Sequence, residues 1–539
     1  MRSEGTRWRE RARLGAAAIA AGALLAACAT AAAARAPGAD QQASGRPVVA
    51  TAGGLVRGMT SGATNEFLGI PYAAPPVGAL RWHAPAPAAP WHGVRAATAF
   101  GANCPQNASP FGQASTSENC LFLNVYAPAG PRGKTGHLPV MFWIHGGALV
   151  TGESNDYNPA RLVAKGTVVV TINYRLGALG FLAHPALASS PGGASGNYGL
   201  MDQQAALRWV QRNIARFGGD PRHVTIFGES AGGLSVLSQL TSPSARGLFS
   251  RAIVESGAYA LNEASLATAE SAGEAFATKA GCSDQTAACL RALPVPAILA
   301  NENAGGYQPD IDGAVLHQSI GPALASGQFN RVPLINGSNH DEWRLFVALD
   351  ELEGQPGVTA QNYVASIEAE LGLPAAAAQA VAARYPLANF PSAPVALGAA
   401  GTDVVFACPA LTVDQSASKF VPVHAYEFAD ENAPERFLPP LGFPYGAAHA
   451  SEIQYLFDIS AAIPGPLNAQ QQRLSAAMQQ YWTNFAKTGI PSSPNVPLWP
   501  AFTTAGQQMI SLAPPQPTTS TTFAARHNCA FWAALKSAG

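Results

Sequence analysis

The stretch Val-Thr-Ile-Phe-Gly-Glu-Ser-Ala-Gly-Gly at residues 224–233 decides the fold class of this chain. It begins as a short apolar run typical of a buried strand, and GESAG at residues 228–232 then fits the pattern G-x-S-x-G. Glycine on both sides of Ser230 allows a sharp turn that leads into a helix and exposes the serine hydroxyl. A strand, this turn and a helix of small residues together predict that Ser230 is a nucleophile rather than a structural serine.

Other apolar runs of strand length lie on both sides of this stretch, at residues 138–144, 167–172, 251–254 and 332–335. Their apolar residues are continuous rather than alternating, which favours strands covered on both faces. Between them, Ala206, Leu207, Val210 and Ile214 mark one face of a helix that Gly218-Gly219 ends. Strands that alternate with helices predict a mostly parallel sheet, and such sheets bind ligands at the carboxyl ends of their strands.

A pair of glycines follows the run at residues 138–144, in the sequence His145-Gly146-Gly147. Glycines without side chains let backbone N–H groups approach a substrate oxygen. Gly146 and Gly147, together with the N–H of Ala231, are therefore predicted to form an oxyanion hole. The loss of one such donor typically costs about 3 kcal/mol of transition-state stabilisation.

A serine nucleophile needs a base, usually a histidine held by a carboxylate. In folds with this turn, the acid and then the histidine follow the serine along the chain. His449 lies in the small-residue loop at 446–450 and is the favoured base. His424 lies in an alternating run and is predicted to be a strand residue. His340 adjoins the acid candidates in sequence, which is poor geometry for a base. The remaining candidates are His317 and His527.

Asp341 and Glu342 are the candidates for the acid, since both follow the predicted strand at 332–335. The pattern alone does not choose between them. Trp343, Phe443 and Tyr445 flank the predicted catalytic positions and are candidates for an apolar pocket or for ordinary core residues.

The composition limits the function classes. Of 539 residues, 48% are hydrophobic and 12% charged, with a formal net charge of −1. Such a chain buries a large core, and the absence of a basic excess argues against nucleic acid as a partner. No His or Cys cluster has the spacing of metal ligands, so a zinc site is not expected. A serine nucleophile with a histidine base needs neither a metal nor an organic cofactor.

The N-terminus is predicted to be an export signal. An arginine-rich segment precedes an Ala-rich apolar run, and cleavage after Ala34-Arg35-Ala36 gives a signal peptide at residues 1–36. The alternative is a lipoprotein signal ending before Cys28, whose lipid would anchor the protein. Residues 37–48 are expected to be a flexible tether and residues 49–539 a single domain, with no transmembrane span in the mature chain.

The cysteines also favour export. Without Cys28, six of the seven cysteines remain, and an even number in an exported protein indicates disulfides. The protein is therefore expected to be secreted or periplasmic, or held at a membrane as a lipoprotein.

Beyond these patterns, the chain resembles the type-B carboxylesterase and cholinesterase family over nearly all of residues 49–535. The resemblance rests on residues 54–58, 67–73, 117–125, 227–233 and 481–489. Asn119 stands where the family usually has Asp, and Trp343 stands where it usually has Gly.

The resemblance implies an α/β-hydrolase fold, with a large, mostly parallel central sheet flanked by helices and inserted helical segments over the active site. It implies that Glu342 is the acid and supports His449 as the base. It also implies three disulfides, which are Cys104–Cys120, Cys282–Cys289 and Cys408–Cys529.

The expected activity is that of a serine esterase. Ser230 would cleave small carboxylic esters of alkyl or aryl alcohols through an acyl-enzyme intermediate. A lipase acting on longer acyl chains is the alternative within the enzymes. The other alternative is a non-catalytic binding or adhesion protein, because the family includes members that keep the fold without the triad. The sequence does not indicate an oligomeric state.

Overall fold

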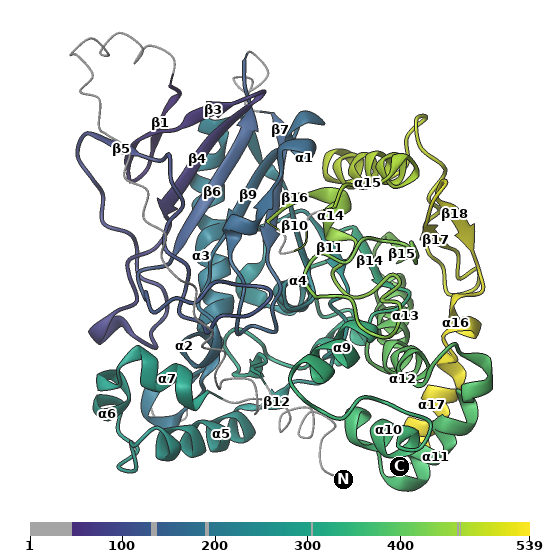
Figure 1. Cartoon of the computed structure of the whole chain (residues 1–539). Coiled ribbons are helices and arrows are strands. Elements are labelled where there is room, and N and C mark those ends of the chain that lie inside the picture. The colour runs from purple at the N-terminus through teal and green to yellow at the C-terminus, as the bar shows by residue number, and fades with distance from the viewer. Residues whose placement is uncertain are drawn as a thin grey trace, which may run out of the picture.

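The centre of the computed structural model is an 11-stranded sheet (Figure 1). The structure describes residues 46–130, 137–188, 193–302, 306–460, 463 and 465–538. In spatial order the strands are β18 (Thr518–Ser520), β17 (Met509–Leu512), β15 (Val423–Phe428), β14 (Leu334–Asn339), β11 (Arg251–Glu255), β10 (Gly219–Glu229), β7 (Leu138–Ile144), β9 (Val168–Ile172), β6 (Phe122–Pro128), β4 (Thr64–Pro71) and β3 (Met59–Ser61).

The strands from β9 to β17 are parallel to their neighbours, whereas the pairings at both edges of the sheet are antiparallel. This arrangement confirms the predicted α/β-hydrolase fold with a mostly parallel sheet. Because the carboxyl ends of parallel strands lie at one edge of a sheet, the loops after β7, β10, β14 and β15 are brought together there.

Both faces of the sheet are covered, as the continuous apolar runs predict. In β7, Val140 and Phe142 belong to one hydrophobic cluster, while Met141 and Trp143 belong to another on the opposite face. The first cluster includes residues of α3 (Tyr198–Asn213), α4 (Ala231–Thr241) and α13 (Cys408–Ala417). The second includes residues of α14 (Ile453–Leu456) and α15 (Ala469–Thr488). Each face therefore has its own core.

The local predictions hold with shifts of boundary, since the strand predicted at residues 332–335 is β14, which begins at Leu334 and extends to Asn339. The helix predicted around residues 206–214 is α3, and Gly218 adopts the left-handed conformation (φ 91°) after the 3-10 turn Ile214–Phe217 that follows it. Strand β10 begins at Gly219, earlier than the apolar run at residue 224, and its register with β7 shifts between Gly219 and Val224. This polar first part of β10 has no apolar pattern from which a strand could be predicted.

Helical segments lie at the carboxyl ends of β14 and β15. They are α9 (Arg344–Leu352), α10 (Tyr363–Leu371), α11 (Ala375–Arg384), α12 (Ala393–Gly401) and the π-helix Thr402–Ala407 that joins α12 to α13 (Figure 1). The continuous stretch Ala393–Ala417 is the one described helix long and apolar enough to cross a membrane, yet 67% of its most apolar part is buried within the protein. Such burial is that of a core helix.

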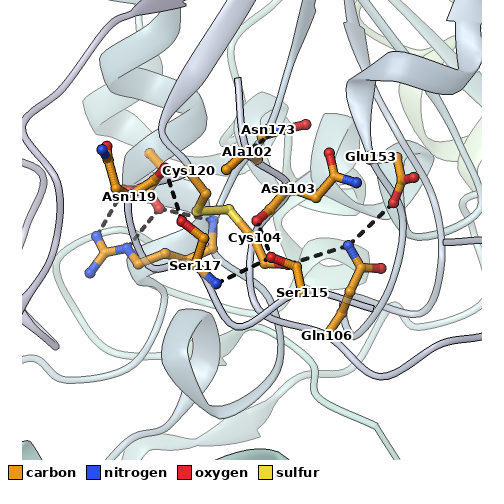
Figure 2. Close-up of a disulfide and its surroundings, with 12 residues drawn as sticks. Ala102, Asn103, Cys104, Gln106, Ser115, Ser117, Asn119, Cys120, Glu153 and Asn173 are labelled. Atoms are coloured by element: carbon orange, nitrogen blue, oxygen red, sulfur yellow. Dashed lines mark hydrogen bonds and ion pairs between the residues drawn. A yellow bond between two sulfur atoms is a disulfide. The ribbon is translucent and has the colours of Figure 1, made fainter. Parts of the chain in front are cut away.

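The structure forms the three disulfides that the family resemblance implied, Cys104–Cys120, Cys282–Cys289 and Cys408–Cys529. Figure 2 shows the first of them, with Gln106 beside it. Gln106 accepts hydrogen bonds from the Thr151 hydroxyl (2.7 Å) and the Gly152 N–H (2.8 Å) through its side-chain oxygen. The disulfide loop therefore braces the turn that follows Gly146 and Gly147.

A small three-stranded sheet lies at the N-terminal side of the domain. It consists of β1 (Val48–Thr51), β2 (Gly54–Arg57) and β5 (Val94–Ala96). The predicted signal segment, Cys28 and residues 37–45 of the predicted tether lie outside the described residues.

Candidate functional site

Ser230 lies on a sharp turn between β10 and α4, with backbone angles φ 56° and ψ −122°. Two glycines make this turn possible through close packing. A Cβ atom on Gly232 would lie 2.0 Å from the carbonyl oxygen of Ile144, and one on Gly228 would lie 2.6 Å from the same atom. The turn is further held by a hydrogen bond from the Ser230 N–H to the Glu255 carbonyl (2.8 Å). The strained serine conformation is thus imposed by its neighbours.

The glycine pair after β7 adjoins the serine. A Cβ on Gly146 would lie 3.1 Å from the Ser230 Cβ, and Gly147 has a φ of 97°. Within the described residues, no acceptor is found for the backbone N–H groups of Gly146, Gly147 or Ala231. These donors are therefore free to bind an oxygen of a ligand beside Ser230.

The structure brings His449 and Glu342 together. The Nδ1 atom of His449 lies 2.6 Å from Oε2 of Glu342, and both side chains are buried. The other carboxylate oxygen of Glu342 accepts a hydrogen bond from the Asn339 N–H (2.7 Å). Glu342, held from behind, therefore fixes both the orientation of the imidazole and the tautomer with its proton on Nδ1.

Asp341, the other acid candidate, points to a different set of groups. Its Oδ2 accepts a hydrogen bond from the Ala447 N–H (2.9 Å), and its Oδ1 lies 2.7 Å from Arg344 and 3.0 Å from His340. Asp341 therefore ties the end of β14 to the loop that carries His449, and it does not contact the imidazole of His449.

The other histidine candidates lie elsewhere. His424 is in β15, as predicted, and its Nδ1 lies 3.2 Å from the Pro500 carbonyl. His527 is buried between Asp403 and Glu427. His317 is exposed. None of these pairs with Glu342.

The second ring nitrogen of His449, Nε2, faces the serine turn. It lies 3.2 Å from Oε1 of Glu229, the residue that precedes Ser230, without forming a hydrogen bond. Within the described residues, no hydrogen bond joins Ser230 to His449 either. Catalytic hydrogen bonds are often long or misaligned in a site without substrate, so this geometry is compatible with a serine–histidine pair.

The charges around His449 change its protonation. Burial lowers its pKa, but the carboxylates of Glu229 and Glu342 outweigh burial and raise it to about 9. Burial in turn raises the pKa of Glu229 well above its usual range. Because both groups are buried and both have raised pKa values, the His449 imidazole and the Glu229 carboxyl compete for the same proton.

Glu452 adds another buried carboxyl that the sequence patterns missed. It lies 2.5 Å from the Asn339 side-chain amide, and burial raises its pKa to about 7. Its position three residues after His449 is the signal that could have found it, because residues at this spacing in a helical turn lie on one side. Glu229 was visible in the G-x-S-x-G motif, but only as the variable position.

Aromatic rings cover the imidazole. The ring centroids of Phe346 and Phe406 lie 5.2 Å and 4.9 Å from that of His449. Trp343 packs behind them, 4.7 Å from Phe346. It fits there because Gly401 on α12 leaves space, since a Cβ on Gly401 would lie 2.2 Å from the indole. The apolar side of the site is therefore formed by Phe346 and Phe406, with Trp343 as their support.

Phe443 and Tyr445 belong to the same hydrophobic cluster as Trp343, with their own centroids 5.9 Å apart. The Tyr445 hydroxyl donates to the Pro439 carbonyl (2.6 Å). In the structure these two rings pack in the core of the helical segments.

Comparisons with known proteins show which family this chain resembles. The model of the carboxylesterase family matches residues 45–532. Acylcarnitine hydrolase of Mus musculus is 37% identical over 469 residues, which cover 82% of each chain. Para-nitrobenzyl esterase of Bacillus subtilis is 37% identical and covers 84% of this chain and 92% of its own. Fumonisin B1 esterase of Sphingopyxis macrogoltabida is 36% identical and covers 92% of this chain and 91% of its own.

These relatives are named for the hydrolysis of esters, so neither the lipase nor the non-catalytic alternative is favoured. The match extends over almost the whole described chain, from the first small sheet to α17 (Cys529–Ala538). The protein is a carboxylic-ester hydrolase, and the chain belongs to the carboxylesterase family.

Proposed function

We propose that Ser230, His449 and Glu342 are the catalytic triad of this esterase. Ser230 Oγ attacks the ester carbonyl while Nε2 of His449 takes its proton. The same imidazole then protonates the leaving alcohol, and water attacks the acyl-enzyme by the reverse route. Glu342 holds the imidazole and stabilises its positive charge.

The backbone N–H groups of Gly146, Gly147 and Ala231 stabilise the oxyanion of each tetrahedral intermediate. Two features support this role. Their N–H groups have no acceptor within the described chain, and the Gly146 backbone lies against Ser230. Ala231 is also the first residue of α4, where the positive end of the helix dipole adds to the stabilisation.

The observation that carries the proposal is the 2.6 Å contact between His449 Nδ1 and Glu342, with Nε2 of the same ring facing the residue next to Ser230. A buried histidine held on one side by a carboxylate and open on the other toward a strained serine is the arrangement that nucleophilic catalysis requires.

The substrates that this site favours are carboxylic esters with alkyl or aryl groups. Phe346 and Phe406 provide apolar surface beside the imidazole, where the alcohol or acyl group of a bound ester would lie. Charged groups at this position would lose their hydration without gaining a partner, so neutral esters are preferred.

Labelling with a fluorophosphonate probe tests the nucleophile. The unmodified protein is expected to be labelled, and Ser230→Ala is expected to abolish labelling. Ser256→Ala is a matched control, because Ser256 is also a buried serine at the end of a strand, with φ 50°. Labelling that survives in Ser230→Ala, or disappears in Ser256→Ala, would overturn the assignment.

A series of nitrophenyl esters of increasing acyl length tests the substrate class. A sharp optimum at short chains is expected for an esterase with rings close to its base. A rate that rises with long chains, especially above their solubility limit, would instead support a lipase.

We also propose that the mature protein is a single exported domain that starts near residue 49, after the signal at residues 1–36 and a short tether. The disulfides are typical of a protein outside the cytoplasm. Mass spectrometry of the mature N-terminus tests the signal, because cleavage after Ala36 and a lipid on Cys28 give different masses.

A further inference from the structure

A cavity of about 660 Å³ lies away from the proposed triad, between α3 and the loop at residues 84–91. None of Ser230, Glu342 or His449 lines it. Its walls combine aromatic rings with positive charge. The residues that matter here are Tyr72, Trp91, Gln204, Arg208, Trp209 and Arg212.

The walls of this cavity are rigid. The loop at residues 84–90 consists of three prolines and four alanines, and the prolines restrict its backbone. Trp91 packs onto the turn at Gly53, where an added Cβ would lie 2.6 Å from the ring, and its indole N–H donates to the Leu55 carbonyl (2.8 Å). The side chain of Asn213 accepts the Ala52 N–H (2.7 Å) and thereby ties the same turn to α3. The cavity is therefore formed before any ligand binds.

The charge in the cavity is positive and unbalanced. Arg208 and Arg212 are exposed at the mouth of the cavity, and among the described residues Arg208 contacts only neutral oxygens, those of Gln204 (3.4 Å) and Ser244 (3.3 Å). For Arg212, neither a hydrogen bond nor an ion pair is found within the described residues. No Asp or Glu is among the described lining residues. Guanidinium groups left without a carboxylate attract an anion.

Nearby elements carry the same charge. Arg216 follows Arg212 by one turn, and Arg95 on β5 lies over the Trp91 ring at 5.5 Å. Among the described residues, neither of these arginines forms an ion pair with an acid, and Arg57 on β2 forms none either. The field of this face therefore reinforces the two arginines in the cavity.

We propose that this cavity binds an organic carboxylate with an aromatic body. The carboxylate lies against Arg208 and Arg212, since guanidinium groups match the planar geometry of a carboxylate. The aromatic body lies against Trp91 and Trp209, whose rings offer apolar surface next to the charge. This inference does not depend on the assignment of the catalytic triad.

Isothermal titration of the full chain with naphthoate, and with neutral naphthamide as the matched ligand, tests the proposal. Naphthoate is expected to bind at one saturable site, and naphthamide at least about tenfold more weakly. Arg208→Gln combined with Arg212→Gln is expected to weaken naphthoate by a similar factor. Arg216→Gln is the control: Arg216 does not line the cavity and adds only to the long-range field, so its loss is expected to weaken naphthoate by less than about twofold.

A second measurement uses the unmodified protein. Naphthoate is expected to protect Arg208 and Arg212, but not Arg216, from modification by phenylglyoxal, as mapped by mass spectrometry. The proposal is overturned by equal binding of naphthoate and naphthamide, by unchanged affinity in the double variant, by lack of saturable binding, or by lack of protection.

Discussion

Two buried histidines, His449 and His527, lie in similar electrostatic surroundings but are bonded differently. Each is between two carboxylates, and for each the carboxylates outweigh burial and raise the pKa to about 9. His527 uses both ring nitrogens, with Nδ1 2.5 Å from Asp403 and Nε2 2.7 Å from Glu427. His449 uses only Nδ1, and its Nε2 has no hydrogen-bond partner within the described residues.

The difference lies in the second nitrogen. A histidine whose two N–H groups are both bound is a structural cation that holds its neighbours together. A histidine with one nitrogen left open can exchange a proton with a substrate. Charge and burial alone therefore do not separate a catalytic histidine from a structural one, whereas the number of engaged nitrogens does.

Replacement of the open histidine is expected to have the largest effect. His449→Gln should lower kcat/KM by roughly 10⁴- to 10⁶-fold, because the general base is lost. It should lower the free energy of unfolding by less than His527→Gln does, because His449 forms one hydrogen bond to a carboxylate and His527 forms two. Steady-state kinetics and urea denaturation measure the two effects. A variant that keeps more than a tenth of the activity would refute the assigned role.

Replacement of the closed histidine should have the opposite profile. His527→Gln is expected to lower the free energy of unfolding by about 3–5 kcal/mol, since it leaves Asp403 buried without its cation, while Glu427 keeps only its ion pair with Arg526. Its kcat/KM at 25 °C should remain close to normal. His223→Gln is the control, because His223 is a half-exposed partner of Asp220, and it should change stability by less than about 0.5 kcal/mol.

The stability of the unmodified protein should depend on pH through both buried histidines, whose pKa values are raised alike, and comparison with His527→Gln isolates the part due to His527. Its pKa is raised from 6.5 to about 9 by folding, so its contribution is complete below pH 6.5 and lost as the pH rises through 9. The loss amounts to about 3 kcal/mol for a shift of this size. Thermal melts between pH 6.5 and 9 should show a steeper decline in Tm for the unmodified protein than for His527→Gln. Parallel declines would contradict this account.

Replacement of Glu229 is expected to have the smallest effect, a shift in the pH dependence of kcat/KM. The rate requires neutral His449, so kcat/KM should rise with pH toward the pKa of the imidazole. Glu229→Gln removes a carboxylate that raises this pKa, and it should move the rising limb toward lower pH by on the order of one unit. Glu255→Gln is the matched control, a buried carboxyl that instead accepts from Trp482 (3.0 Å). An unmoved limb in Glu229→Gln would show that this carboxyl is already neutral.

Much of the fold and of the site could be predicted from the sequence, because the relevant signals are local. Strands β7 and β11 begin where their apolar runs begin, and the turn around Ser230 is marked by glycines that a Cβ would disrupt. The pairing of His449 with Glu342 rather than Asp341 could not be predicted from local patterns. Both acids follow the same strand, and only the direction of each side chain in the folded protein distinguishes them.

The residues that the sequence did not reveal act over long separations. Phe346 and Phe406 reach His449 from α9 and the π-helix, and no periodicity in either segment indicates that contact. The pair of arginines on α3 has the spacing of any solvated helix face. Its meaning depends on the proline-rich loop more than a hundred residues earlier in the chain, which forms the facing wall.

The π-helix Thr402–Ala407 connects the two histidines within a single turn of backbone. Asp403 binds His527, and three residues later Phe406 lies over His449. One short helix therefore affects both the shape of the ester site and the thermal stability of the enzyme. Variants that accept bulkier esters through changes at Phe406 should therefore also show a changed melting temperature. Changes at Phe346 on α9 should alter selectivity without affecting the contact between Asp403 and His527.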